Sequence, residues 1–87
     1  MITGDAKMMQ NLEGAIADRP GFITAARKEC RLNTRKIDES CEVLRFGGDL
    51  AAEVYGSTVF IKRDIPLELD SQLRLLAVSY GLTPYTL

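Results

Sequence analysis

Few of the residue types in this chain support catalysis. The 87 residues include two cysteines, Cys30 and Cys41, and no histidine. Without histidine there is no Ser–His or Cys–His pair, and no imidazole to act as a base or metal ligand. Two thiols cannot complete a structural zinc site, which needs four nitrogen or sulfur ligands. No pair of carboxylates or lysines stands out either, so we expect a protein that is not an enzyme and has no metal and no cofactor.

The two cysteines are expected to be reduced and structural. The N-terminal residues Met1–Asp5 lack the basic and then apolar run of a signal peptide. This predicts a cytoplasmic location, in which thiols stay reduced. No stretch approaches the roughly 18 consecutive apolar residues of a membrane span. We therefore expect no disulfide and no membrane partner.

Basic residues gather in one block of the chain. Residues 19–36 carry six Lys or Arg against Glu29 alone, a net charge of +5, whereas residues 1–18 have −2 and residues 37–87 have −4. Such a block in an otherwise acidic chain is typical of a surface that meets a polyanion. The alternative is a solvated basic surface without a partner. The predicted nucleic-acid or partner-binding residues are Arg27, Lys28, Arg31, Thr34, Arg35 and Lys36.

Two helices are predicted ahead of this block and within it. The first runs from about Asp5 to Asp18, and its apolar face consists of Met8 or Met9, Leu12, Ala15 and Ile16. Arg19-Pro20-Gly21 ends it, and a second helix begins near Phe22. The second helix has an apolar stripe of Ile23, Ala26 and Cys30, while Arg27, Lys28 and Arg31 share another side.

A third helix is predicted from Asn33, which is a favourable N-cap. Ile37, Cys41 and Leu44 recur at i, i+4 and i+7, the spacing of one buried helical face. Gly47-Gly48 ends this helix. The second and third helices together predict a helix–turn–helix whose third helix offers its N-terminal N–H groups to a phosphate.

Residues 51–62 have the pattern of a hairpin. Two apolar runs flank Gly56-Ser57, a pair that suits a two-residue type II′ turn. In that register Val54 lies opposite Val59 and Ala52 opposite Ile61, while the other side carries Tyr55, Thr58, Phe60 and Lys62. A competing interpretation makes Asp49–Tyr55 a short helix.

The last predicted helix runs from about Pro66 to Tyr80, with Gly81 as its stop. Its apolar stripe consists of Leu69, Leu73, Leu76 and Tyr80. The remaining residues are too few to build another helix. This tail, which includes Tyr85, either covers Tyr55 and Phe60 or leaves them exposed to a partner.

These elements predict an α+β fold in a single domain of residues 1–87. We expect a small helical domain of three to four helices with a two-stranded antiparallel hairpin. A content of 46% hydrophobic and 26% charged residues suits a globular chain rather than a disordered one. The predicted core consists of Leu12, Ile16, Ile37, Cys41, Leu44, Val59, Ile61, Leu69, Leu73 and Leu76.

The order of elements from residue 5 to residue 63 resembles the winged helix-turn-helix family of DNA-binding proteins: helix, helix, recognition helix and two-stranded wing. The resemblance implies that Thr34, Arg35 and Lys36 meet DNA and that Lys62 and Arg63 lie near the wing. The C-terminal part is also similar to a truncated ribbon-helix-helix repressor, in which a strand over residues 58–62 precedes a helix over residues 66–81.

The predicted function is non-catalytic transcription regulation by DNA binding through the basic helix-turn-helix segment, residues 19–36. The alternative is a small protein-binding inhibitor or adaptor, of the kind that small phage proteins often are, which blocks a partner's nucleic-acid or substrate surface. Its secondary partner face would be Tyr55, Phe60, Lys62 and Arg63. The expected partner is DNA or a nucleic-acid-handling protein, and a homodimer is compatible with both functions.

Overall fold

The computed structural model describes residues 17–87, which form two helices and five strands. The helix predicted from Asp5, with its core residues Leu12 and Ile16, lies outside the described residues. The elements follow one another as α2 (Arg19–Glu29), β1 (Asn33–Asp38), β2 (Cys41–Phe46), β3 (Asp49–Tyr55), β4 (Thr58–Ile61), α3 (Leu67–Ser79) and β5 (Thr83–Thr86).

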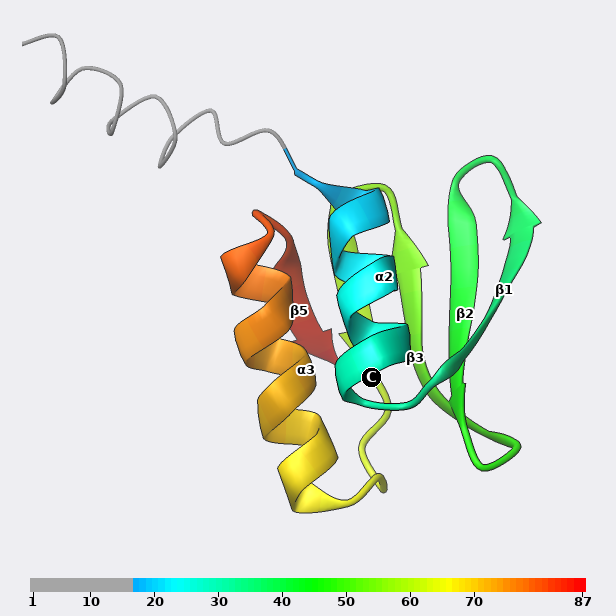
Figure 1. Cartoon of the computed structure of the whole chain (residues 1–87), viewed down its shortest axis with the longest axis vertical. Helices are drawn as coiled ribbons and strands as arrows, with labels where there is room; N and C mark the ends of the chain where they lie inside the picture. The colour runs from blue at the N-terminus through cyan, green and yellow to red at the C-terminus, as the bar shows by residue number, and fades with distance from the viewer. Residues whose placement is uncertain (1–16) are drawn as a thin grey trace, which may run out of the picture.

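All five strands form one sheet in the order β1-β2-β3-β4-β5. The first four strands are antiparallel neighbours joined by short turns, and β5 pairs in parallel with β4 after the crossover through α3. Figure 1 shows α2 and α3 side by side on one face of the sheet, with the β1–β2 hairpin extending beyond this helical layer. The other face of the sheet has no helix of residues 17–87 on it, and we call it the open face.

The predicted fold class is wrong, because a mixed five-stranded sheet replaces the small helical domain with its single hairpin. The error lies at the third helix: residues 33–46 form the antiparallel strands β1 and β2. Asp38 closes a turn between them, since its Oδ1 accepts hydrogen bonds from the Ser40 N–H at 2.8 Å and from the Ser40 hydroxyl at 2.9 Å. These two bonds lower the pKa of Asp38. Residues 17–87 thus contain no recognition helix at Thr34–Lys36.

The hairpin prediction is confirmed in its register. Strands β3 and β4 pair Val54 with Val59 and Ala52 with Ile61. Gly56 takes a φ of +58°, the positive value that the first position of a type II′ turn requires. The competing helix over residues 49–55 is wrong, because β3 pairs with a neighbouring strand on each side.

Both helices have clear sequence boundaries. Asp18 caps α2 by accepting a hydrogen bond from the Gly21 N–H at 3.0 Å, so residues 19–21 open this helix. The prediction of α3 is confirmed within about one residue at each end. Gly81 has a φ of +79°, and the Leu82 N–H donates to the Ala77 carbonyl at 2.8 Å, which closes the helix.

The core lies between the helices and the sheet. Phe22, Leu44, Ile61 and Leu73 are fully buried, and the sequence prediction had omitted Phe22. The predicted core residues that are buried are Cys41, Leu44, Val59, Ile61, Leu69 and Leu73, while Leu76 is partly buried. The prediction for Ile37 is wrong, because its side chain is 55% exposed on the edge strand β1.

Candidate nucleic-acid interface

Side chains of a β-strand alternate between its two faces, and the strand register therefore assigns each residue to a face. Leu44, Val54 and Ile61 belong to the core beneath the helices. The residues next to them along each strand point to the open face. One cross-strand row on the open face consists of Arg35, Val43, Glu53, Phe60 and Tyr85, each paired with the next.

An aromatic cluster lies within this open face. The rings of Tyr55 and Phe60 meet edge to face at 5.8 Å between centroids, with an interplanar angle of 74°. Phe60 and Tyr85 lie nearly parallel at 6.0 Å and 26°. Tyr55 is 45% exposed and Tyr85 is 54% exposed, so the C-terminal strand extends the cluster without covering it. The three side chains, which we call the aromatic triad, present ring faces and edges to solvent.

The hydroxyl of Tyr55 is affected by two neighbours, Cys41 opposite it on β2 and Glu53 two residues before it on β3. It interacts with the Cys41 thiol and with the Glu53 carboxylate, and these two interactions raise the pKa of Tyr55 to about 12. The phenol is therefore neutral throughout the physiological range, and it acts as a hydrogen-bond donor at the edge of the triad.

Two arginines belong to the same face as the triad. Arg35 pairs with Val43 and shares the row that contains Phe60 and Tyr85. Arg45 lies two residues beyond Val43 on β2, opposite Asn33, and its Nη1 donates to the Gly48 carbonyl at 2.9 Å. Both side chains are exposed. Glu53 is the acidic residue of this row, and Asp38, which pairs with Cys41, is a second acid on the open face, so the two arginines are matched by two carboxylates.

A second basic surface lies at the C-terminal end of α2. Arg27, Lys28 and Arg31 line one shallow hollow together with Asn33, so three of the predicted binding residues are brought together. Arg27 and Lys28 occupy the last turn of α2, where the helix dipole favours cations. Arg31 follows the helix with a φ of +56°. We call Arg27, Lys28 and Arg31 the basic cluster.

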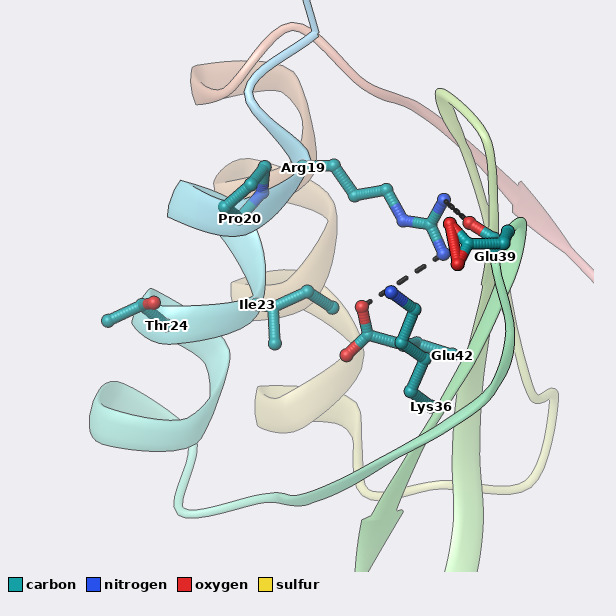
Figure 2. Close-up of a pocket in the computed structure, with 7 residues that line it drawn as sticks. All are labelled: Arg19, Pro20, Ile23, Thr24, Lys36, Glu39 and Glu42. Carbon is teal, nitrogen blue, oxygen red and sulfur yellow. Dashed lines mark hydrogen bonds and ion pairs between the residues drawn. The ribbon is translucent and has the colours of Figure 1, made fainter.

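The other three predicted binding residues do not lie on one surface of the protein. They are Thr34, Arg35 and Lys36. Thr34 and Lys36 lie on the helix side of β1, opposite to Arg35, because successive residues of a strand alternate. Figure 2 shows Lys36 beside Glu42 in a hollow between α2 and the β1–β2 hairpin. The predicted binding residues between 27 and 36 therefore do not form one continuous site, because β1 directs them to both faces of the sheet.

Arg19 spans that hollow from the first turn of α2. Its Nη1 donates to the Glu39 carbonyl at 3.5 Å, and its Nη2 lies 4.0 Å from Glu42 Oε1 (Figure 2). Bases and acids are thus balanced in this hollow. The arrangement ties α2 to the β1–β2 hairpin and leaves little net charge for a ligand.

The secondary partner face is only partly assembled. Tyr55 and Phe60 lie together as predicted, whereas Lys62 lines a hollow with Phe46 and Asp49 at the opposite end of β4. Arg63 is exposed in the loop that leads to α3. Sequence reasoning named Tyr85 only as part of a tail that could cover Tyr55 and Phe60, and it missed Arg45. The alternation of Val43 and Arg45 within a strand was the signal for Arg45, but it requires residues 41–46 to be recognised as a strand.

Both thiols are buried and free. Burial, and to a smaller extent the neighbouring Glu29, raises the pKa of Cys30, which makes this thiol a poor nucleophile. Within residues 17–87 no group of three or more His, Cys, Asp or Glu side chains is placed to hold a metal ion. No helix in that range is long and apolar enough to cross a membrane.

Comparison with known protein families, with curated proteins and with solved structures gave no match to this chain. The function is therefore inferred from the geometry of the open face and of the basic cluster.

Proposed function

We propose that this protein binds single-stranded nucleic acid on the open face of its sheet. The observation that carries the proposal is the aromatic triad, in which Tyr55 and Tyr85 are exposed and Phe60 is half-buried between them, with Arg35 and Arg45 farther along the same face on β1 and β2. Unpaired bases stack on aromatic side chains, and arginines beside such a platform contact the phosphates. A sheet backed by helices on one side and open on the other is a suitable support for this mode of binding.

The geometry favours a single strand over a duplex. A duplex hides its base faces, and its major groove is read by a helix or by a two-stranded ribbon that enters it. The helix expected to do so, from Asn33 onward, is the edge strand β1. The triad instead offers ring surfaces on a sheet, which only splayed bases can reach.

The basic cluster is assigned a supporting role. A phosphate near Arg27 and Lys28 would also meet the negative end of the α2 dipole, which offsets part of the attraction. Arg35 and Arg45 lie on strands, whose net dipoles are small. We therefore place the main phosphate contacts on the open face.

The rival function is a protein-binding inhibitor or adaptor. Glu53 favours it, because this half-buried carboxylate lies in the middle of the open-face row and repels phosphate. Aromatic side chains are also enriched in protein interfaces. A protein partner would be recovered in stoichiometric amount by the tagged chain after nuclease treatment of a lysate.

The test is a fluorescence anisotropy titration of the full chain with a labelled 12-nucleotide single strand, as DNA and as RNA, and with the matching duplex. We expect binding to a single strand that exceeds binding to the duplex and weakens with salt. Each phosphate contact contributes about 0.7 to the slope of log affinity against log salt concentration. Absence of binding to both single strands, at low salt, would contradict the proposal.

Two neighbouring residues provide a matched pair of variants. Arg35→Ala removes a charge from the open face, and Lys36→Ala removes the same charge from the helix side of the same strand. We expect the first change to reduce the salt slope by about 0.7 and the second to leave it unchanged. Equal effects would show that general charge, rather than the open face, determines binding.

A further inference from the structure

The two edges of the sheet differ in how readily a further strand can join them. One edge is β5, where the Thr83 N–H donates to the Ser57 carbonyl at 2.9 Å and the Leu87 N–H donates to the Ile61 carbonyl at 2.8 Å, both on the side of β4. Because successive residues of a strand direct their amides to opposite sides, Pro84 faces the free edge of β5. Proline has no N–H, so β5 offers an incomplete set of donors to a further strand.

The opposite edge, formed by β1, has no such block. β1 is six residues long and contains no proline, and its backbone makes no hydrogen bond to the other described residues apart from those of the β1–β2 pair. Alternate residues of β1 therefore direct an N–H and a C=O away from β2. Figure 1 shows the β1–β2 hairpin extending beyond α2 and α3, so neither helix covers this edge.

The side chains of β1 determine which strand this edge can accept. Arg35 lies on the open face and Lys36 on the helix side, and both are exposed. Ile37, the next residue, is 55% exposed. Consecutive residues thus present one positive charge on each face of the sheet and then an apolar side chain. A complementary strand carries two adjacent acidic residues opposite Arg35 and Lys36 and an apolar residue opposite Ile37.

The acidic residues beside these bases already have other partners. Asp38 accepts hydrogen bonds from the Ser40 N–H and hydroxyl, and Glu42, opposite Lys36 on β2, lies 4.0 Å from Arg19. Neither Arg35 nor Lys36 forms an ion pair with another residue of 17–87. The two bases are therefore available to carboxylates from outside the described fold.

We propose that the free edge of β1 binds an extended acidic segment of another protein as a sixth strand of the sheet. Main-chain hydrogen bonds to β1 supply affinity in this mode of binding, and the side chains of the edge supply specificity. A nucleic-acid backbone has no alternating N–H and C=O groups to match those of β1. The inference does not rest on the proposed function, because Arg35 belongs to both surfaces whereas Lys36 belongs to the edge and not to the open face.

A second copy of the chain is a weaker occupant of this edge. The antiparallel register that pairs all six residues of two β1 strands puts Arg35 of each copy opposite Lys36 of the other. Like charges directly opposite one another on neighbouring strands are destabilising. An acidic segment replaces both repulsions with attractions.

The experiment is a fluorescence anisotropy titration of the full chain, without nucleic acid, with a labelled peptide of about ten residues. The glutamate peptide consists of valine and threonine with an isoleucine and two adjacent glutamates at its centre, and the lysine peptide has lysines in place of the glutamates. We expect the glutamate peptide to bind at least about tenfold more tightly. Equal affinities would overturn the proposal.

Charge reversal tests the position of the site. Arg35→Glu with Lys36→Glu should make the chain prefer the lysine peptide, whereas Arg27→Glu with Lys28→Glu, at the end of α2, should keep the preference for the glutamate peptide. An unchanged preference in the first variant, with circular dichroism showing an intact fold, would overturn the proposal. Lys36→Ala should weaken peptide binding and leave single-strand binding unchanged, so failure of this proposal is distinguishable from failure of the proposed function.

A measurement on the unmodified protein separates strand addition from charge attraction. Two versions of the glutamate peptide carry N-methyl groups on alternate residues, one set for each edge of the peptide strand. Only one set removes the donors that face β1, so we expect one version to lose at least about tenfold in affinity and the other to stay within about threefold. Equal losses would overturn the proposal. A dimer of the chain that the glutamate peptide does not dissociate, in sedimentation equilibrium, would assign the edge to a second copy and would also overturn it.

Discussion

The two faces of the sheet differ in what covers them. On the helix side Leu44, Val54, Val59 and Ile61 are completely buried beneath α2 and α3. On the open face Tyr55 and Tyr85 keep about half of their surface in water, although each carries a large aromatic ring. Folding accounts for the first set of side chains and does not account for the second. This difference is the reason for proposing the open face as the binding surface.

The largest expected effect is on the free energy of unfolding, and it distinguishes two neighbouring residues of β4 that lie on opposite faces of the sheet. Ile61→Ala removes a fully buried side chain and should lower the free energy of unfolding by about 2–5 kcal/mol. Phe60→Ala, one residue earlier, removes two aromatic contacts on the open face and should cost at most about 2 kcal/mol. Urea denaturation measures both. Equal losses would mean that the open face is part of the structural core.

The next effect is on the affinity for a single strand, and it compares charges on the open face with charges in the basic cluster. Arg35→Glu reverses one charge on the open face and should weaken single-strand binding about tenfold at 0.1 M salt. The double variant Arg27→Glu with Arg31→Glu reverses two charges and should weaken it at most about threefold, since charges beyond about 10 Å are screened. Anisotropy titrations compare the two. A larger loss from the double variant would move the binding site to the end of α2.

A smaller effect concerns the hydroxyl of Tyr55. Because its pKa is raised from 10 to about 12 in the folded chain, the neutral phenol contributes stability that is fully present below pH 10 and is lost as the pH rises through 12. In Tyr55→Phe this loss should disappear. The ultraviolet titration of the wild type minus that of the variant should give a midpoint near 12. A midpoint near 10 would show that Cys41 and Glu53 do not hold the hydroxyl.

The sequence was sufficient where local signals agreed. Gly56-Ser57 and the alternation around it predicted the β3–β4 register, because a two-residue turn leaves few alternatives. Pro66 and Gly81 delimited α3 in the same way. Both predictions depend on residues close together in the chain, and both are confirmed.

The sequence led to a wrong prediction where buried strand residues happen to have the spacing of a helical face. Cys41 and Leu44 are both buried, but Cys41 pairs with Tyr55 on the open face and Leu44 belongs to the core on the other. Two buried residues three apart therefore look like one helical face, although they lie on opposite sides of a strand. This error placed Arg35 and Lys36 on one surface, whereas the strand puts them on opposite faces, and it hid Arg45.

Tyr85 could not be assigned from local pattern. Its place beside Phe60 depends on the parallel pairing of β5 with β4, which the chain reaches only after the whole of α3. Such a crossover is a long-range arrangement without a turn motif to mark it. The triad therefore became visible only in the folded chain.

The most direct test of the proposed function is the affinity of Tyr85→Ala for a labelled single strand. Tyr85 lies on the short strand at the edge of the sheet, and its loss should leave the fold intact. The dissociation constant should rise about 5- to 150-fold, which corresponds to the loss of one stacked base at about 1–3 kcal/mol. Leu67→Ala, which removes an exposed side chain from α3, should leave the affinity within twofold. Wild-type affinity in Tyr85→Ala would contradict binding on the open face.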